Sequence, residues 1–140
     1  LEVEEACKSI EGFKGVKGRA LAEKTERGIF VNCSNRGVNV TAMLSAIDEA
    51  QSLKGVKADG IVAVFSGSER ATCEIIDTPR LGEELKKRDI DLIILSGALG
   101  RRLAELGIQG EFVENLSKNE VERLSARFNN PLILFFSNEA

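Results

Sequence analysis

The stretch FVNCSNRGVNVTAML at residues 30–44 gathers polar and cationic side chains where an apolar segment gives way to a helical pattern. The side chains are those of Asn32, Ser34, Asn35 and Arg36. Backbone N–H groups at the start of a helix favour anions, and a guanidinium adds a full positive charge. The stretch therefore predicts a site for a phosphate or a carboxylate. The same residues also suit a turn that only caps a helix, and the residues alone leave both interpretations open.

A second polar loop, SGSERA at residues 66–71, follows the most apolar segment of the chain. The guanidinium of Arg70 can hold two carboxylate oxygens at once, and Ser66 and Ser68 offer hydroxyl groups beside it. This combination predicts a loop that grips an acidic substrate. The alternative is that Glu69 and Arg70 are solvated surface charges.

Arg19 follows the glycine-rich stretch EGFKGVKGR, which has the composition of a hinge. An arginine at the entry of a domain can reach phosphates bound on a neighbouring domain when the two close. The alternative is a charge on an edge strand that discourages aggregation. Arg19 is a candidate catalytic residue under the first interpretation only.

The apolar periodicity predicts the elements that position these loops. Three apolar runs without alternation are typical of strands buried on both faces, and they lie at 60–67, 91–95 and 132–136. A hairpin is expected from 19–25 and 28–33, and a short strand at 111–114. Helical patterns occupy 2–11, 40–53, 79–88, 97–106 and a segment after Ser117.

Capping signals predict where some of these helices begin and end. Thr78 and Pro79 suit the N-cap and the first helical position, and Ser117 and Glu120 have the capping-box spacing. Gly107 is expected to end the helix that precedes it.

Strands that alternate with helices predict an α/β fold: a Rossmann-like three-layer sandwich with a mostly parallel sheet and an N-terminal antiparallel hairpin strand. Ligands of such sheets collect at the carboxyl ends of the strands. Those ends are the loops 32–39, 66–71 and 96–98, together with Ser137. We expect them to meet at one rim.

Composition and charge exclude several classes of function. A chain of 140 residues with 43% hydrophobic content suits one domain, and a net charge of -3 without Trp or Tyr argues against nucleic acid as a partner. No apolar run approaches the roughly 20 residues that span a bilayer, which argues against a membrane partner and favours the cytoplasm. The chain has no His and no dinucleotide or P-loop motif, so any catalysis here depends on positioning and charge.

Taken in order, several segments resemble the C-terminal domain of the Mur ligase superfamily. They are FKGVKGRALAE, FVNCSNRGVNVTAMLSAI, IVAVFSGSERA, DLIILSGALGRRLAEL and LILFFSNEA. The resemblance implies an interdomain helix and hinge at 1–17 and a Mur ligase C-terminal-like Rossmann domain at 18–140.

The resemblance also implies residue roles. Arg19 approaches the ATP phosphates, with Asn32, Ser34, Asn35 and Arg36 beside the nucleotide and acceptor. Ser66, Ser68, Arg70 and Ser137 face the incoming substrate. The chain departs from the family at Cys33, where an acidic residue is usual, and at Phe135 or Phe136, where a lysine is often found.

By this resemblance the chain is the substrate-positioning and lid domain of an ATP-dependent carboxylate–amine ligase, which forms an amide bond. ATP and Mg²⁺ are bound mainly by an upstream ATP-binding domain, the substrates are a small carboxylate and an amine, and the isolated domain is inactive. Divergent members, among them archaeal ligases for pseudomurein and the synthase of the methanogens' nickel tetrapyrrole, act on other carboxylates, and the sequence does not choose among them. The alternative hypothesis is a stand-alone Rossmann-like module that binds a small anion or a protein without catalysis.

Overall fold

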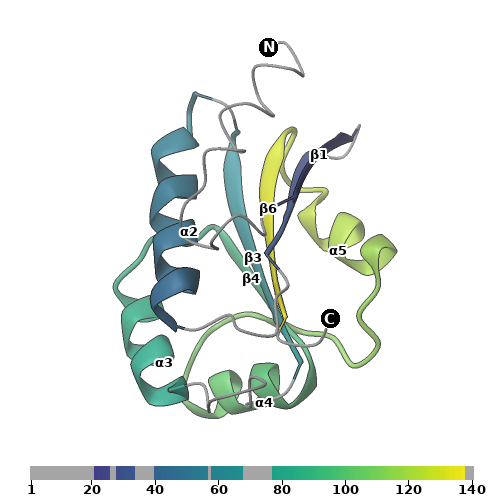
Figure 1. Cartoon of the computed structure of the whole chain (residues 1–140). Coiled ribbons are helices and arrows are strands. Elements are labelled where there is room, and N and C mark those ends of the chain that lie inside the picture. Colours follow the sequence, from purple (N-terminus) through teal and green to yellow (C-terminus); the bar gives the residue numbers. More distant parts are fainter. Residues whose placement is uncertain (1–20, 26–27, 34–39, 57, 68–76, 138–140) are drawn as a thin grey trace.

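A six-stranded sheet forms the centre of the molecule, in the order β1-β2-β6-β3-β4-β5 (Figure 1). The computed structural model describes residues 21–25, 28–33, 40–56, 58–67 and 77–137. The strands are β1 Leu21–Thr25, β2 Gly28–Asn32, β3 Gly60–Ser66, β4 Leu92–Leu95, β5 Glu111–Phe112 and β6 Pro131–Ser137. The helices are α2 Val40–Leu53, α3 Thr78–Lys86, α4 Gly97–Glu105 and α5 Lys118–Ser125.

All neighbouring strands run parallel except β1, which pairs with β2 in the antiparallel direction. This arrangement confirms the predicted mostly parallel sheet with an N-terminal antiparallel hairpin strand. The last strand, β6, lies between β2 and β3 and forms hydrogen-bonded ladders with both. The chain thus returns to the middle of the sheet after β5.

The hairpin between β1 and β2 depends on Gly28. Its φ is +136°, and a Cβ atom added there would lie 2.5 Å from the carbonyl oxygen of Pro131. Glycine therefore serves two purposes at this position: it takes up a conformation that L side chains avoid, and it lets β6 approach β2. Residues 26–27 of the predicted turn lie outside the described residues.

The two faces of the sheet are covered by different helices. Ile61, Ala63 and Phe65 of β3 belong to the larger apolar cluster, packed with residues of α2, α3 and α4. Val62 and Val64 point the opposite way, into the cluster that includes Val121 of α5. Figure 1 shows α2 and α3 on one side of the sheet and α5 on the other. We call these the α2 face and the α5 face; together with the sheet they form the three predicted layers.

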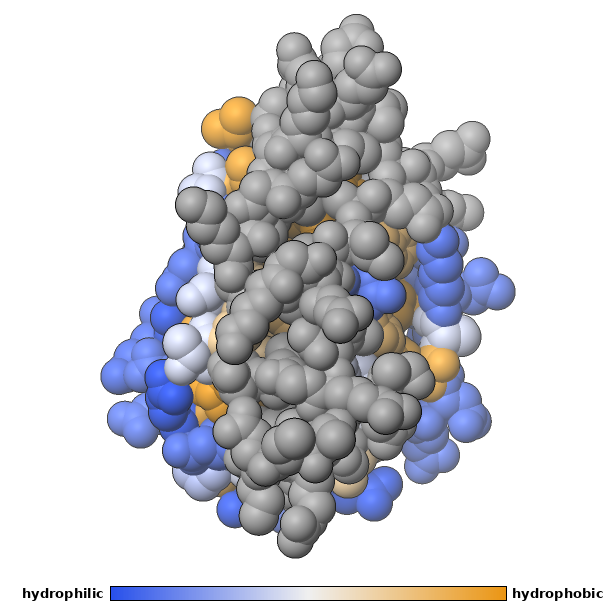
Figure 2. All heavy atoms as spheres, viewed as in Figure 1, coloured by the Kyte–Doolittle hydropathy of each residue, from blue (hydrophilic) through white to orange (hydrophobic). Residues whose placement is uncertain are grey.

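The outer surface of the helical layers is mostly hydrophilic at the margins of the view in Figure 2. In the part of the chain that the structure describes, only Val56 and Phe112 are large apolar side chains that stand exposed. No helix among the same residues is long and apolar enough to cross a bilayer. Most apolar side chains of the described residues therefore pack against one of the two faces of the sheet.

One helix cap differs from the prediction. Asp77, rather than Thr78, is the N-cap of α3, and its Oδ1 accepts a hydrogen bond from the Arg80 amide at 3.1 Å. Thr78 is instead the first helical residue and is buried. Both residue types make good caps, and the burial of Thr78 leaves the capping position to the preceding aspartate. The predicted cap of α5 is confirmed, because Ser117 Oγ accepts from the Glu120 amide at 3.2 Å.

Several predicted ends also shift. The helix predicted at 79–88 ends at Lys86, and the strand predicted at 111–114 is only two residues long. Gly107, at φ +91°, ends the α4 segment as expected. The predicted helix at 2–11 and the rest of the predicted interdomain segment 1–17 lie outside the described residues.

Two carboxylates secure the edge of the sheet where the parallel strands begin. Asp59 accepts hydrogen bonds from the amides of Asn129 (2.7 Å) and Asn130 (2.9 Å), which precede β6. Asp91 accepts from the Ile61 amide at 2.8 Å and pairs with Lys54 Nζ at 2.7 Å. These contacts tie together the connections at one edge, while the opposite edge carries the polar strand ends.

Candidate active-site rim

The carboxyl ends of β2, β6, β3 and β4 lie at one edge of the sheet because these neighbouring strands are parallel. We call this edge the carboxyl-end rim and define it by Asn32, Ser66, Ser96 and Ser137. Ser66 and Ser137 are register partners, so two of the predicted substrate-binding residues are neighbours in space. The expectation that the described strand ends meet at one rim is confirmed.

Two glycines bring the strand ends of β3 and β4 close together. Gly67 and Gly97 both have positive φ, at +96° and +66°. A Cβ atom on Gly97 would lie 2.9 Å from the carbonyl oxygen of Gly67, and the same oxygen accepts a hydrogen bond from the Leu99 amide at 3.0 Å. The start of α4 is therefore held against the end of β3, and this part of the rim is firmly positioned.

Ser96, in the predicted polar loop 96–98, has a structural partner. Its side chain is buried, and its Oγ donates a hydrogen bond to the carbonyl oxygen of Val113 at 2.7 Å. Its amide donates to the carbonyl of Phe65 at 2.9 Å. Ser96 thus joins the ends of β3 and β4 to the segment after β5 and is not available to a ligand in this arrangement.

Asn32 ends β2 and is exposed, but its side chain belongs to the α5 face. Side chains alternate along a strand, and Ile29, Val31 and Cys33 all lie in the cluster on the α2 face. Asn32 therefore lines a cavity between β2, β6 and α5 instead of facing the start of α2. The cavity has a volume of about 330 Å³ and is lined by Phe30, Val31, Asn32, Leu116, Ser117, Lys118, Val121 and Phe135. We call it the β2–α5 cavity.

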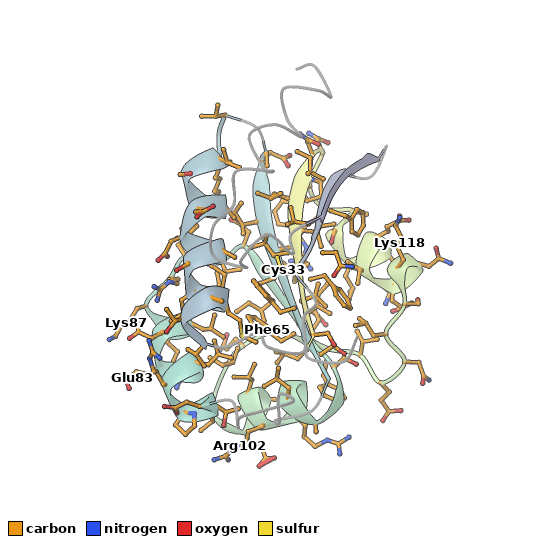
Figure 3. All side chains as sticks on the ribbon, in the orientation of Figure 1. Cys33, Phe65, Glu83, Lys87, Arg102 and Lys118 are labelled. Carbon is orange, nitrogen blue, oxygen red and sulfur yellow. The ribbon has the colours of Figure 1, made fainter. Side chains whose placement is uncertain are left out.

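Cys33 stands where the resembling family has an acidic residue, and the structure buries it completely. Burial raises the pKa of the Cys33 thiol from 9.0 to about 12, and Sγ lies 3.8 Å from the Val31 carbonyl oxygen. Figure 3 shows Cys33 in the interior, like Phe65. A buried, neutral thiol does not fit the contact that a carboxylate makes with a ribose hydroxyl, so the described end of β2 supplies no such contact.

Most of the predicted cationic and hydroxyl groups of the two loops lie outside the described residues. These are Arg19, Ser34, Asn35, Arg36, Ser68 and Arg70. Among the described residues, no group of three or more Cys, Asp or Glu side chains is placed to hold a metal ion. The described part of the chain therefore offers Mg²⁺ no ligand set of that kind.

Arg80 is a cation of this region that the sequence analysis missed. It lies in the first turn of α3, and its Nη2 atom donates to Thr41 Oγ1, in the first turn of α2, at 3.3 Å. Both helices follow strands that end at the carboxyl-end rim, so the guanidinium lies where the positive ends of two helix dipoles meet. The sequence feature that could have identified Arg80 is its position directly after the expected helix start at Thr78 and Pro79.

Lys118 was missed as well. Its Nζ lies 5.0 Å from the centroid of the Phe30 ring, which places a positive charge at the wall of the β2–α5 cavity. Figure 3 shows Lys118 on α5, on the opposite side of the molecule from Lys87. Nothing local in the sequence pairs residues 30 and 118, which belong to elements far apart along the chain.

Of two comparisons with known proteins, one gave a match. A search of curated protein sequences found no significant match. A family model described as "Coenzyme F430 synthetase CfbE, C-terminal domain" matches residues 22–138, which cover most of the chain. The match agrees with the predicted C-terminal domain of an ATP-dependent ligase and names a coenzyme synthetase, not a cell-wall ligase. The chain therefore belongs to the family of coenzyme F430 synthetase CfbE C-terminal domains.

Proposed function

We propose that this chain is the substrate-positioning and closing domain of an ATP-dependent ligase that activates a carboxylate. The family match supports the ligase assignment and favours it over a stand-alone binding module. The name of the matched family makes a carboxylic-acid precursor of coenzyme F430 the substrate that we propose. The amine as the second substrate remains a prediction from the sequence resemblance.

The carboxyl-end rim is the observation that carries the positioning role. Ser66 and Ser137 lie side by side on β3 and β6, and the Gly67–Gly97 contact holds the start of α4 beside them. Hydroxyl groups on a rigid strand edge can orient a substrate by hydrogen bonding, and orientation alone contributes several kcal/mol to such reactions. This edge is also where ligands of parallel α/β sheets bind.

The closing role is assigned to the loops around the rim. We propose that Arg19 approaches the ATP phosphates when this domain meets the upstream ATP-binding domain, and that Asn35 and Arg36 lie beside them. Ser68 and Arg70 would then hold the substrate together with Ser66 and Ser137. Arg80 adds a positive charge at the starts of α2 and α3, close to where those loops are attached.

In this function ATP supplies the phosphoryl group that activates the carboxylate, and the residues of this chain orient the reacting groups and exclude water. Proximity and fixed charges suffice for such a role without a histidine, which the chain lacks. The chain by itself contains no P-loop motif, and we expect it to be inactive without the rest of the enzyme.

The test measures ATP-dependent phosphate release by the full-length protein with the carboxylic-acid precursor of coenzyme F430. We expect Arg19→Ala to lower the rate at least tenfold, and the double variant Ser66→Ala/Ser137→Ala to raise KM for the precursor. Ser125→Ala is the matched control, because Ser125 is buried on α5 and away from the rim. It should leave the rate unchanged.

Each result has a defined consequence. Wild-type activity of Arg19→Ala would remove Arg19 from the mechanism. Wild-type kinetics of the double serine variant would remove the rim from substrate binding. Failure of the wild-type enzyme to release phosphate with the precursor, while it releases phosphate with another carboxylate, would overturn the proposed substrate but keep the reaction type.

A further inference from the structure

The helix α4 is not capped by the side chain of its own N-cap residue. That residue is Ser96, and a serine at this position ordinarily accepts a hydrogen bond from the second or third amide of the helix. Here the Ser96 side chain makes no such bond, and its Oγ donates instead to the carbonyl oxygen of Val113 at 2.7 Å. The cap of α4 therefore comes from another part of the chain.

The carbonyl oxygen of Gly67 provides this cap. It accepts a hydrogen bond at 3.0 Å from the amide of Leu99, the third residue of α4. We call this hydrogen bond the capping bond. Gly67 directly follows β3, so the acceptor is a backbone group in the turn after that strand. The start of α4 and the end of β3 are thereby joined.

The capping bond extends the connection between β3 and β4 beyond their ladder. The ladder ends at the pair Phe65–Leu95, and the Ser96 amide then donates to the Phe65 carbonyl at 2.9 Å. On the other side of β3, the ladder with β6 continues to Ser66 and Ser137. Ser66 therefore lies between the ladder with β6 on one side and the capping bond on the other, and both hold it in place.

Gly97 makes the capping bond possible because it has no side chain. A Cβ atom there would lie 2.9 Å from the carbonyl oxygen of Gly67 and 3.1 Å from its amide nitrogen. Both atoms belong to the backbone and not to the end of a flexible side chain, so Gly97→Ala must displace Gly67 or the start of α4. Either movement disturbs the capping bond. The φ of +66° at Gly97 adds backbone strain, which is a separate effect.

We propose that Gly97 is a positioning residue for the ligase reaction: by admitting the Gly67 carbonyl as the cap of α4, it fixes the Ser66 hydroxyl for contact with the substrate. The proposal rests on the proposed function for the role of Ser66 in substrate binding. The geometry of the turn after β3 is then set by α4 and not by the strand alone. A displaced Ser66 loses a hydrogen bond to the substrate, which weakens substrate binding and leaves the chemical step unchanged.

The kinetic test measures phosphate release by the full-length protein at varied concentrations of the carboxylic-acid precursor of coenzyme F430. Gly97→Ala should raise KM for the precursor about fivefold, as expected for the loss of one hydrogen bond, and leave KM for ATP at the wild-type value. Destabilisation alone acts differently, because it lowers the fraction of folded enzyme and hence the apparent kcat without changing KM. The two effects are therefore measured by separate parameters.

Gly97→Asn separates the contact from the backbone strain. Asparagine tolerates the left-handed conformation better than alanine does, but it carries the same Cβ atom. We expect KM for the precursor to rise as in Gly97→Ala, with a smaller loss of stability. The same variant provides the measurement if Gly97→Ala does not fold. A wild-type KM for Gly97→Asn would mean that only strain matters, and it would overturn the proposal.

Gly60→Ala is the matched control. Gly60 begins β3 at the opposite end of the same strand, and a Cβ atom there would overlap the ring of Phe128. The substitution therefore disturbs the packing of this strand at a distance from the capping bond. We expect the apparent kcat to follow the folded fraction and KM for the precursor to stay unchanged. An equal rise of KM in Gly60→Ala and Gly97→Ala would indicate a general loosening of the sheet and would overturn the proposal.

Amide hydrogen exchange tests the capping bond without the reaction. In the 140-residue chain, labelled with ¹⁵N, the exchange rate of the Leu99 amide is compared with that of Leu103, one turn further along α4. We expect Gly97→Ala and Gly97→Asn to raise the ratio of the two rates about tenfold, because the Leu99 amide loses its acceptor, and Gly60→Ala to leave the ratio unchanged. An unchanged ratio in both Gly97 variants would overturn the proposal.

The two measurements distinguish this proposal from the proposed function. A raised exchange ratio together with wild-type KM values would overturn the positioning role of Gly97, while the ligase function would stand. If the wild-type protein released no phosphate with any carboxylate, the proposed function would fall, and the substrate contact of Ser66 would fall with it. A raised exchange ratio would then still establish the Gly67 carbonyl as the cap of α4.

Discussion

Asn32 of β2 and Phe135 of β6 are register partners, and their side chains lie on the same face of the sheet, where both line the β2–α5 cavity. Residue 33, one position further along β2, points to the other face and is buried. A single step along the strand thus separates an exposed amide from a core thiol.

The first prediction concerns this position of Asn32. In the full-length enzyme we expect Asn32→Ala to raise KM for the carboxylate substrate and to leave KM for ATP unchanged, because the amide faces the cavity and not the start of α2. Stability should change by less than about 0.5 kcal/mol, since the side chain is exposed. Initial-rate kinetics with each substrate varied in turn provide the measurement. An increase in KM for ATP alone would return Asn32 to the nucleotide site.

A second prediction concerns Arg80. We expect Arg80→Ala to lower kcat/KM of the full-length enzyme about tenfold, because the substitution removes a cation from the starts of α2 and α3 where anionic substrates are expected. Thermal unfolding should be nearly unchanged, since Arg80 is exposed and its side chain donates one long hydrogen bond, of 3.3 Å, to the Thr41 hydroxyl at the surface. Arg127→Ala is the control, an exposed arginine beyond the end of α5. Equal activity of the two variants would exclude Arg80 from the function.

A third prediction separates steric overlap from backbone strain. Gly97→Ala places a Cβ atom 2.9 Å from a carbonyl oxygen at φ +66°, whereas Gly55→Ala meets nothing within 4 Å at φ +84°. We expect a loss of about 1 kcal/mol for Gly55→Ala, from strain alone, and of about 2 to 4 kcal/mol for Gly97→Ala. Urea denaturation of the two variants measures the difference. Equal losses would mean that the contact between Gly67 and Gly97 is easily relaxed.

The buried thiol of Cys33 leads to a fourth prediction. In the unfolded chain the thiol loses its proton near its ordinary pKa of 9.0, while the native thiol keeps it up to about 12. Between these values the unfolded state binds fewer protons, so the free energy of unfolding falls as the pH rises, by at most about 1.4 kcal/mol per pH unit from this group. Below pH 9 the contribution is fully present. We expect Cys33→Ala to flatten the curve between pH 9 and 11, as measured by denaturation at each pH.

The other cysteines, Cys7 and Cys73, are the same in both proteins, so their titration cancels in the comparison. Below pH 8 the two curves should run parallel, separated only by the loss of packing. Parallel curves up to pH 11 as well would show that the native thiol titrates normally.

A fifth prediction concerns two buried serines, whose replacement by alanine should change the free energy of unfolding in opposite directions. Ser125 Oγ is buried with no hydrogen-bond partner in the described part of the chain, whereas Ser96 Oγ donates to the Val113 carbonyl at 2.7 Å. An unsatisfied buried hydroxyl costs stability, so Ser125→Ala should raise the free energy of unfolding by about 1 kcal/mol. Ser96→Ala should lower it by about 1 to 2 kcal/mol, because the carbonyl loses its donor. Chemical denaturation of both variants measures these changes. A loss of stability in Ser125→Ala would instead show that the Ser125 hydroxyl has a hydrogen-bond partner.

The sequence by itself determined the types and the order of the elements in the described chain. Apolar runs such as 132–136 and the helical spacing from Val40 onward are local patterns that follow from burial on one or both sides of an element. Ser117 was identified as a cap for the same reason, since capping depends on residues three positions apart. Asp77 and Thr78 are both suitable caps, and only the burial of Thr78 decided between them.

The tertiary structure alone decided which residues meet. The insertion of β6 between β2 and β3 makes Ser66 a neighbour of Ser137 and Asn32 a neighbour of Phe135, although these residues lie far apart in the sequence. The register of β2 sends Cys33 into the core and Asn32 toward α5. Strand order, register and the Lys118–Phe30 contact depend on long-range packing of whole elements, and no local pattern of residues encodes such pairings.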